Sequence, residues 1–170
     1  MFRALIILLL CLPACQILPQ GGVARSAASG VAGAWSGQAV IATGQHRVLI
    51  GEARVITQGG PPVYLLQIGQ RWDGVARPIT RPSVWMDGVE LPFAPSPRST
   101  RFCVAAGDCL GRSLGAILMS ADMFTAAAQE GLQAELIGTD VTLAISAPPT
   151  LFSDALARAL AAGLLSGVSR

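Results

Sequence analysis

Two short runs of alternating apolar and polar residues near the C-terminus do most to limit the fold. Apolar side chains occupy every second position of residues 132–136 and again of residues 141–145. A period of two indicates strands with one buried face. The Gly-Thr-Asp sequence of residues 138–140 joins the runs, so we expect an antiparallel hairpin. Its apolar face needs a cover, which a second sheet supplies in a sandwich.

The stretch from Trp35 to Phe93 also has the texture of strands. Residues 48–57 are rich in apolar side chains, and residues 63–72 place Tyr64, Leu66, Ile68 and Trp72 on one face. Gly59-Gly60-Pro61-Pro62 predicts a turn between these strands. Asp87-Gly88 predicts a second hairpin, because glycine tolerates the positive φ of a tight turn.

Helix signals occur at two places. Ser120 is a candidate N-cap, Asp122 suits the first turn, and Gly131 is a candidate terminator, so we expect a helix over residues 121–130. A last helix is expected over about residues 153–162. The predicted fold class is therefore mostly β: an antiparallel β-sandwich-like domain with one short internal helix and a C-terminal helix.

The N-terminal segment has the form of a bacterial lipoprotein signal. Arg3 supplies a positive charge, residues 4–12 are apolar, and Leu12-Pro13-Ala14-Cys15 resembles the lipobox of lipoproteins. The apolar run is shorter than the roughly 20 residues that span a bilayer. We expect a signal peptide over residues 1–14, lipidation at Cys15, and a lipid anchor in the membrane.

Gln16 rather than aspartate follows the cysteine, which by resemblance to the sorting rules of enteric bacteria favours a periplasm-facing location on the outer membrane. Residues 15–33, rich in Gly, Ala and Ser, predict a lipidated N-terminus and a flexible tether. The β-rich domain is then expected over residues 34–170. The alternative is an ordinary signal peptide and a periplasmic or secreted, unlipidated domain.

Two cysteines, Cys103 and Cys109, remain after the signal and lipid positions are set aside. A close pair in an exported chain is most simply a disulfide bond. A metal site would need more ligands than this pair, and the single histidine, His46, lies far away in sequence. No metal is expected.

Composition excludes several classes of function. The chain has 12 basic and 10 acidic residues, a balance that argues against electrostatic binding of nucleic acid. It contains no lysine, which excludes lysine Schiff bases and a Walker-type phosphate loop. No cofactor is expected.

A series of short motifs in the C-terminal half suggests a family. The features are Asp87-Gly88, Phe102-Cys103, Cys109, the helix ended by Gly131, the hairpin, and Phe152-x-x-Ala155-Leu156. In this order they resemble the invasion-associated locus B family of exported α-proteobacterial proteins, over about residues 84–157. The resemblance implies a β-sandwich-like envelope protein without enzymatic activity.

One motif offers a catalytic alternative. Gly111-Arg112-Ser113-Leu114-Gly115 matches G-x-S-x-G, the nucleophile elbow of α/β hydrolases. That motif needs a strand before it, a helix after it, and an acid and a histidine downstream, whereas His46 lies upstream. An exported serine hydrolase using Ser113 is therefore the alternative to a non-catalytic binding or scaffolding domain.

Tryptophans and arginines supply the candidate binding face. Trp72 and Trp85, with Arg77 and Arg81, lie close together in the sequence. Exposed together, they would form a surface for an envelope protein partner. The arginines would contact lipid phosphate or carboxylates of that partner; scattered surface charge is the alternative.

Overall fold

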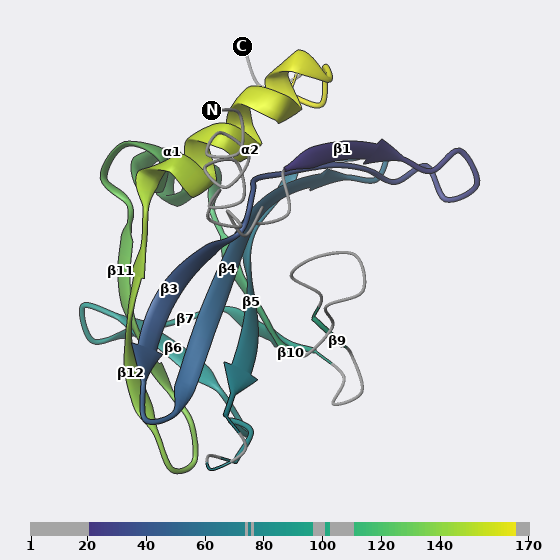
Figure 1. The fold of residues 1–170 in the computed structure, drawn as a ribbon. Coiled ribbons are helices and arrows are strands. Elements are labelled where there is room, and N and C mark those ends of the chain that lie inside the picture. The colour runs from purple at the N-terminus through teal and green to yellow at the C-terminus, as the bar shows by residue number, and fades with distance from the viewer. Residues whose placement is uncertain (1–20, 74, 76, 97–100, 103–110, 166–170) are drawn as a thin grey trace, which may run out of the picture.

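Two antiparallel sheets face each other in the computed structural model, which describes residues 21–73, 75, 77–96, 101–102 and 111–165 (Figure 1). The prediction of a mostly β, sandwich-like domain with two helices is confirmed. The eight-stranded sheet contains β1 (Gly22–Arg25), β2 (Ala32–Trp35), β3 (Ala39–Gly44), β4 (Arg47–Thr57), β5 (Val63–Trp72), β8 (Phe93–Pro95), β9 (Arg101–Phe102) and β10 (Gly111–Met119). The four-stranded sheet contains β6 (Ser83–Met86), β7 (Val89–Leu91), β11 (Leu132–Ile137) and β12 (Thr142–Ala147).

Strand order explains where the core lies. The larger sheet runs β1-β2-β4-β5-β10-β8, with β3 also beside β4 and β9 beside β10, and the smaller runs β12-β11-β6-β7. Alternate residues of β4 and β5 point inward, among them Leu49, Leu66 and Ile68, which are fully buried. They belong to one core with Leu136 and Ile145 of the smaller sheet.

The two predicted hairpins form as expected. Leu136 is the register partner of Leu143 and Ala134 that of Ile145, so the apolar alternation of β11 and β12 faces the core. In the β6–β7 hairpin, Asp87 and Gly88 have φ of 51° and 77°. This left-handed pair explains why the turn needs a glycine.

Two helices cover one end of the sheets: α1 (Ala121–Glu130) and α2 (Pro149–Ala161) (Figure 1). The Ser120 hydroxyl accepts a hydrogen bond from the N–H of Met123 at 3.1 Å, as an N-cap does. Phe124 lies between Tyr64 and Phe152, with ring centroids 5.2 Å away on both sides. These rings join both helices to the larger sheet.

The folded part begins earlier than the sequence indicated. Strands β1 and β2 pair within and just after residues 15–33, where a tether was predicted, and the boundary at residue 34 falls inside β2. Their glycine and alanine content gives no alternation to recognise. Likewise, α2 begins at Pro149 rather than near residue 153, because proline suits the first turn of a helix.

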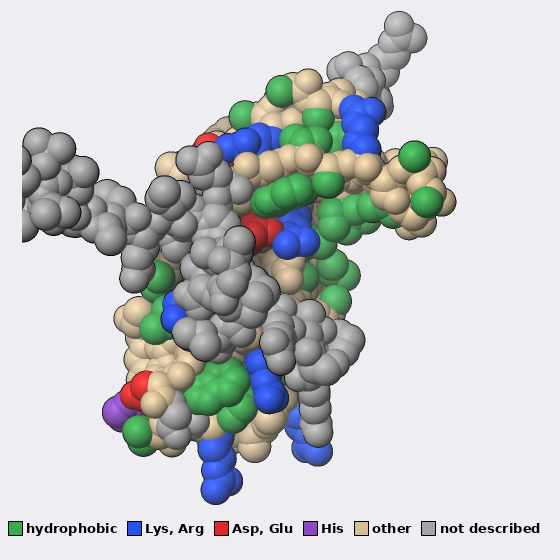
Figure 2. All heavy atoms as spheres, turned by 45° about the vertical axis from the view of Figure 1, so that its right-hand side comes forward, with side chains coloured by type: hydrophobic (Ala, Val, Ile, Leu, Met, Phe, Trp, Pro, Cys, Tyr) green, Lys and Arg blue, Asp and Glu red, His purple; other side chains and the backbone are tan. Residues whose placement is uncertain are grey.

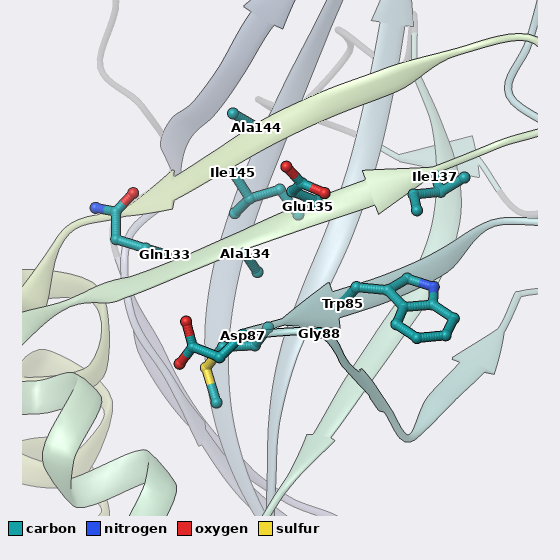
Figure 3. A pocket seen from close by; sticks show the side chains of 10 residues that line it. Trp85, Asp87, Gly88, Gln133, Ala134, Glu135, Ile137, Ala144 and Ile145 are labelled. Carbon is teal, nitrogen blue, oxygen red and sulfur yellow. The ribbon is translucent and has the colours of Figure 1, made fainter.

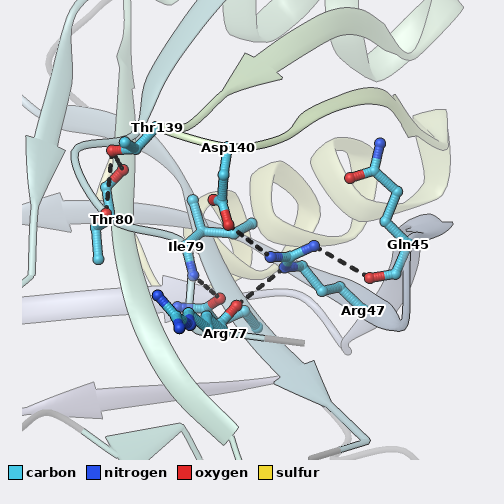
Figure 4. Close-up of polar contacts among 8 residues, drawn as sticks. Gln45, Arg47, Arg77, Ile79, Thr80, Thr139 and Asp140 are labelled. Carbon is cyan, nitrogen blue, oxygen red and sulfur yellow. Dashed lines mark hydrogen bonds and ion pairs between the residues drawn. The ribbon is translucent and has the colours of Figure 1, made fainter. Parts of the chain in front are cut away.

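A buried arginine ties the sheets together at the end opposite the helices (Figure 4). Arg47 of β4 donates to the backbone carbonyls of Gln45 and Arg77, each at 3.1 Å. Its guanidinium also lies 3.5 Å from Asp140, in the turn between β11 and β12. This end of the sandwich is therefore held by polar contacts.

Candidate functional site

The predicted covalent sites lie outside the described residues. This holds for the lipidation site at Cys15 and for the cysteines at 103 and 109. Within the described ranges no helix is long and apolar enough to cross a membrane. The anchor and the disulfide stay predictions.

The predicted binding face is divided between the two sheets. Trp72 ends β5 in the larger sheet, whereas Trp85 belongs to β6 in the smaller one, and they line different cavities. Arg77 and Arg81 lie in the connection between these strands, and both are exposed. The structure brings Arg81 together with a residue that the sequence analysis left out of the face, Arg112 of β10.

Arg81 and Arg112 line one cavity of about 500 Å³ beside the β5–β6 connection. Its other lining residues include Gln70, Ser96 and Ser113, and no Asp or Glu is among the described ones. Neither arginine has an ion pair with a carboxylate of the described chain. The backbone of Arg81 has φ of 51°, a conformation that costs energy in a non-glycine residue. We call this space the arginine cavity.

Buried polar side chains form the floor of the arginine cavity. Gln70 is 3% exposed, and its Oε1 accepts a hydrogen bond from the N–H of Ile79 at 2.9 Å. This bond holds the later half of the β5–β6 connection against β5. Ser113 is 6% exposed, and its hydroxyl shares a hydrogen bond of 2.7 Å with that of Ser96. The cavity therefore presents amide and hydroxyl groups as well as guanidinium groups.

Arg112 links the arginine cavity to Trp72. Its guanidinium carbon lies 5.7 Å from the centroid of the indole ring, a cation–π distance. Trp72 in turn lines a neighbouring cavity of about 510 Å³, together with Arg71 and His46. His46 Nδ1 lies 2.7 Å from an oxygen of Asp73. Arginine side chains therefore line both cavities: Arg81 and Arg112 the first, and Arg71 the second.

Figure 2 shows the charge distribution on the side of the molecule that lies to the right in Figure 1. Several basic side chains are spread from the upper to the lower part of this view, and few acidic ones are seen. In β4 the carboxylate of Glu52 is buried, and it accepts hydrogen bonds from Gln38 at 3.1 Å and Arg54 at 2.5 Å.

Ser113 does not have the surroundings of a nucleophile elbow. It lies inside strand β10 rather than at a turn from a strand into a helix. Its hydroxyl partners are Ser96 and, at 3.5 Å, Gln67, so neither a histidine nor an acid contacts it in the described part of the chain. His46 is instead paired with Asp73 at the tip of β4 and β5.

One residue of the arginine cavity, Gln70, could have been found from the sequence, and another, Arg112, could not. Gln70 is a polar residue on the apolar face of residues 63–72, which is a signal of a buried polar role. Arg112 gave no such signal, because its neighbour Trp72 is distant in sequence and meets it only through the pairing of β10 with β5.

Groups of acidic, histidine and cysteine side chains that could hold a metal ion do not occur among the described residues. Comparison of the chain with protein-family models, with curated proteins and with solved structures finds no match. The resemblance to the invasion-associated locus B family therefore stays a prediction.

Proposed function

We propose that this protein is an outer-membrane-anchored lipoprotein of the cell envelope whose β-rich domain binds a partner and does not catalyse a reaction. The arginine cavity would hold an anionic group of that partner, a carboxylate or a phosphate. The proposal for the anchor rests on the lipobox sequence that ends at Cys15. The proposal for binding rests on the cavity.

The observation that carries the binding proposal is a pair of arginines at one cavity that have no carboxylate partner in the described part of the chain. Arg81 and Arg112 line the same space with the buried side chains of Gln70 and Ser113. Two guanidinium groups repel each other, so an anion between them would relieve the repulsion and accept their hydrogen bonds. The stacking of Arg112 on Trp72 holds its planar head at the edge of the cavity.

Calorimetric titration of the mature protein in non-ionic detergent would test this site. The probes are inorganic phosphate and acetate at fixed ionic strength. We expect Arg81→Gln and Arg112→Gln each to weaken binding about tenfold, as for loss of a charged hydrogen bond. Arg77→Gln is the matched control, because it removes the same charge from the exposed connection next to the cavity.

Equal weakening by all three variants would mean that net charge alone attracts the anions, and the site proposal would fail. Preference for phosphate would indicate a lipid headgroup or another phosphate ester as the partner, and preference for acetate would indicate the carboxylates of a protein.

The intact mass of protein extracted from its native membrane tests the anchor. We expect the mass of residues 15–170 plus a diacylglyceryl and an N-acyl group, rising by about two mass units when a disulfide is reduced. A mass of the polypeptide alone would indicate a secreted domain and would remove the membrane from the proposal.

The hydrolase alternative is tested by the change Ser113→Ala. The hydroxyl of Ser113 shares its hydrogen bond with Ser96, and a non-catalytic role predicts that the change removes no hydrolytic activity. An esterase or peptidase activity that is present in the native protein and lost in the variant would replace binding with catalysis as the function.

A further inference from the structure

A tryptophan lies between two glutamates on the outer face of the four-stranded sheet. Trp85 of β6 is the register partner of Glu135 on β11 and of Glu90 on β7. Register partners in neighbouring strands leave a sheet on the same face. Val84, the neighbour of Trp85 in sequence, is fully buried, so the face that carries Trp85 is the one turned away from the core.

Trp85 and Glu135 of this row border a cavity of about 520 Å³ (Figure 3). Its lining includes Trp85, Met86, Asp87, Glu135 and Ile137. The indole N–H of Trp85 donates to the hydroxyl of Ser83 at 3.1 Å, which fixes the orientation of the ring. The cavity thus offers an oriented aromatic surface, apolar side chains and carboxylates.

Among the described strands and helix next to this face, no basic side chain balances these carboxylates. Strands β6, β7, β11 and β12 contain neither Arg nor Lys, and helix α1 contains none either. Asp87, Glu90 and Glu135 are exposed, and none has an ion pair or hydrogen bond to another side chain of the described chain. The face is therefore electronegative, in contrast to the arginine cavity.

Such a combination selects for organic cations. An indole ring attracts a cation over its face, and carboxylates beside the ring add charge–charge attraction. Ile137, the register partner of Ser83, adds apolar surface on the same face, which a bare metal ion would not use. A long aliphatic stem with a cationic end matches both parts of the lining, and arginine and lysine side chains have this form.

We propose that this face binds an arginine or lysine side chain of a protein partner, with the cationic head over Trp85 and next to Glu135, and the stem along Ile137. The site is separate from the arginine cavity and has the opposite charge. It therefore does not depend on the function proposed above, and the two sites would recognise different parts of a partner.

Titration of the mature protein with N-acetylarginine amide tests the proposal, with the chemical shifts of its backbone amides as the readout. The citrulline analogue is the neutral probe of the same shape, and tetramethylammonium is the small cation without a stem. Low, fixed ionic strength keeps the attraction measurable. We expect shifts in β6 and β11 with the arginine probe, and binding at least about fivefold weaker with each of the other two.

Glu135→Gln and Trp85→Leu should each weaken binding of the arginine probe about fivefold, and Glu90→Gln is expected to act in the same direction. Glu130→Gln, at the end of α1, is the matched control and should leave the affinity unchanged. Glutamine in place of the exposed Glu135 keeps the shape of the side chain, so this variant stays informative if Trp85→Leu destabilises the fold.

Three results would each overturn the proposal. One is equal binding of the citrulline probe, which would show that the charge is not recognised. Another is equal weakening by Glu130→Gln and Glu135→Gln, which would show a diffuse charge effect. The third is tetramethylammonium binding as tightly as the arginine probe, which would assign the site to small amines and not to a protein side chain.

Discussion

The guanidinium of Arg47 lies 3.5 Å from the carboxylate of Asp140 and so links the two sheets of the sandwich. The side chain of Arg47 is 6% exposed, whereas that of Asp140 is 52% exposed. Arg47 also satisfies two backbone carbonyls, of Gln45 and Arg77. Arg47 is therefore the more buried of the two residues, and it makes more polar contacts than Asp140.

This asymmetry predicts unequal effects of mutation. Arg47→Met should lower the free energy of unfolding by about 2–4 kcal/mol, because two carbonyls lose their donor. Asp140→Asn should lower it by less than about 1 kcal/mol, because the partner carboxylate is solvated. Urea unfolding of both variants measures the difference, and equal losses would contradict the assignment of the stability to the carbonyl contacts.

Gly115 should tolerate no side chain. Its φ is 154°, it follows a register shift in β10, and a Cβ there would meet the carbonyl oxygen of Ala94 at 2.4 Å. We expect Gly115→Ala to lower the free energy of unfolding by about 2–4 kcal/mol, through a clash with backbone that cannot move freely. Gly60→Ala is the control, because no atom lies within 4 Å of a Cβ at that position. Thermal unfolding that ranked the two variants equally would refute the steric argument.

The single tyrosine predicts a specific alkaline transition. Burial raises the pKa of Tyr64 above its ordinary value of 10.0. Below that value the phenol is neutral in both states; above it the unfolded chain ionises first, so stability falls as the pH rises from 10.0 through the folded pKa. The chain contains no lysine, so no lysine titration overlaps this range.

We expect the Tyr64→Phe variant to lose less stability than the native protein between about pH 9 and about pH 11, with similar stability near neutral pH. Urea unfolding across this range, with the ultraviolet absorbance of the phenolate as a direct titration, measures both effects. A phenolate that titrates at its ordinary pKa in the folded protein would show that the hydroxyl is solvated.

The N-cap of α1 predicts a smaller effect. Ser120→Ala removes the acceptor for the N–H of Met123 and should cost about 1 kcal/mol. Thr125→Ala is the matched control, since this hydroxyl bonds only to the carbonyl of Ala121 within the helix and its loss should be close to neutral. Equal losses in chemical unfolding would mean that the cap is not stabilising.

The elements that could be predicted from the sequence are those whose signals lie close together in the chain. Helix α1 and the β11–β12 hairpin were predicted because their signals, the Ser120 cap, Gly131 and the period of two, lie within the elements themselves. The pairing of β1 with β2 was missed, because glycine and alanine leave no alternation to read.

The arginine cavity needed the structure for the same reason. Arg81 and Arg112 are brought together only by the packing of the β5–β6 connection beside β10. The predicted grouping of Trp72 with Trp85 followed closeness in sequence, whereas the chain passes from one sheet to the other between them.

The separation of charge between the two sheets has a consequence for orientation. The strands of the larger sheet carry Arg25, Arg47, Arg54, Arg71 and Arg112, while the smaller sheet and α1 carry only acidic charges. A body with a formal net charge of only +2 is weakly attracted to a charged surface as a whole, but its permanent dipole moment experiences a torque there. The electric field of a lipid headgroup layer would therefore orient this domain. Anionic lipids would turn the arginine strands toward the bilayer and the acidic sheet toward the aqueous space.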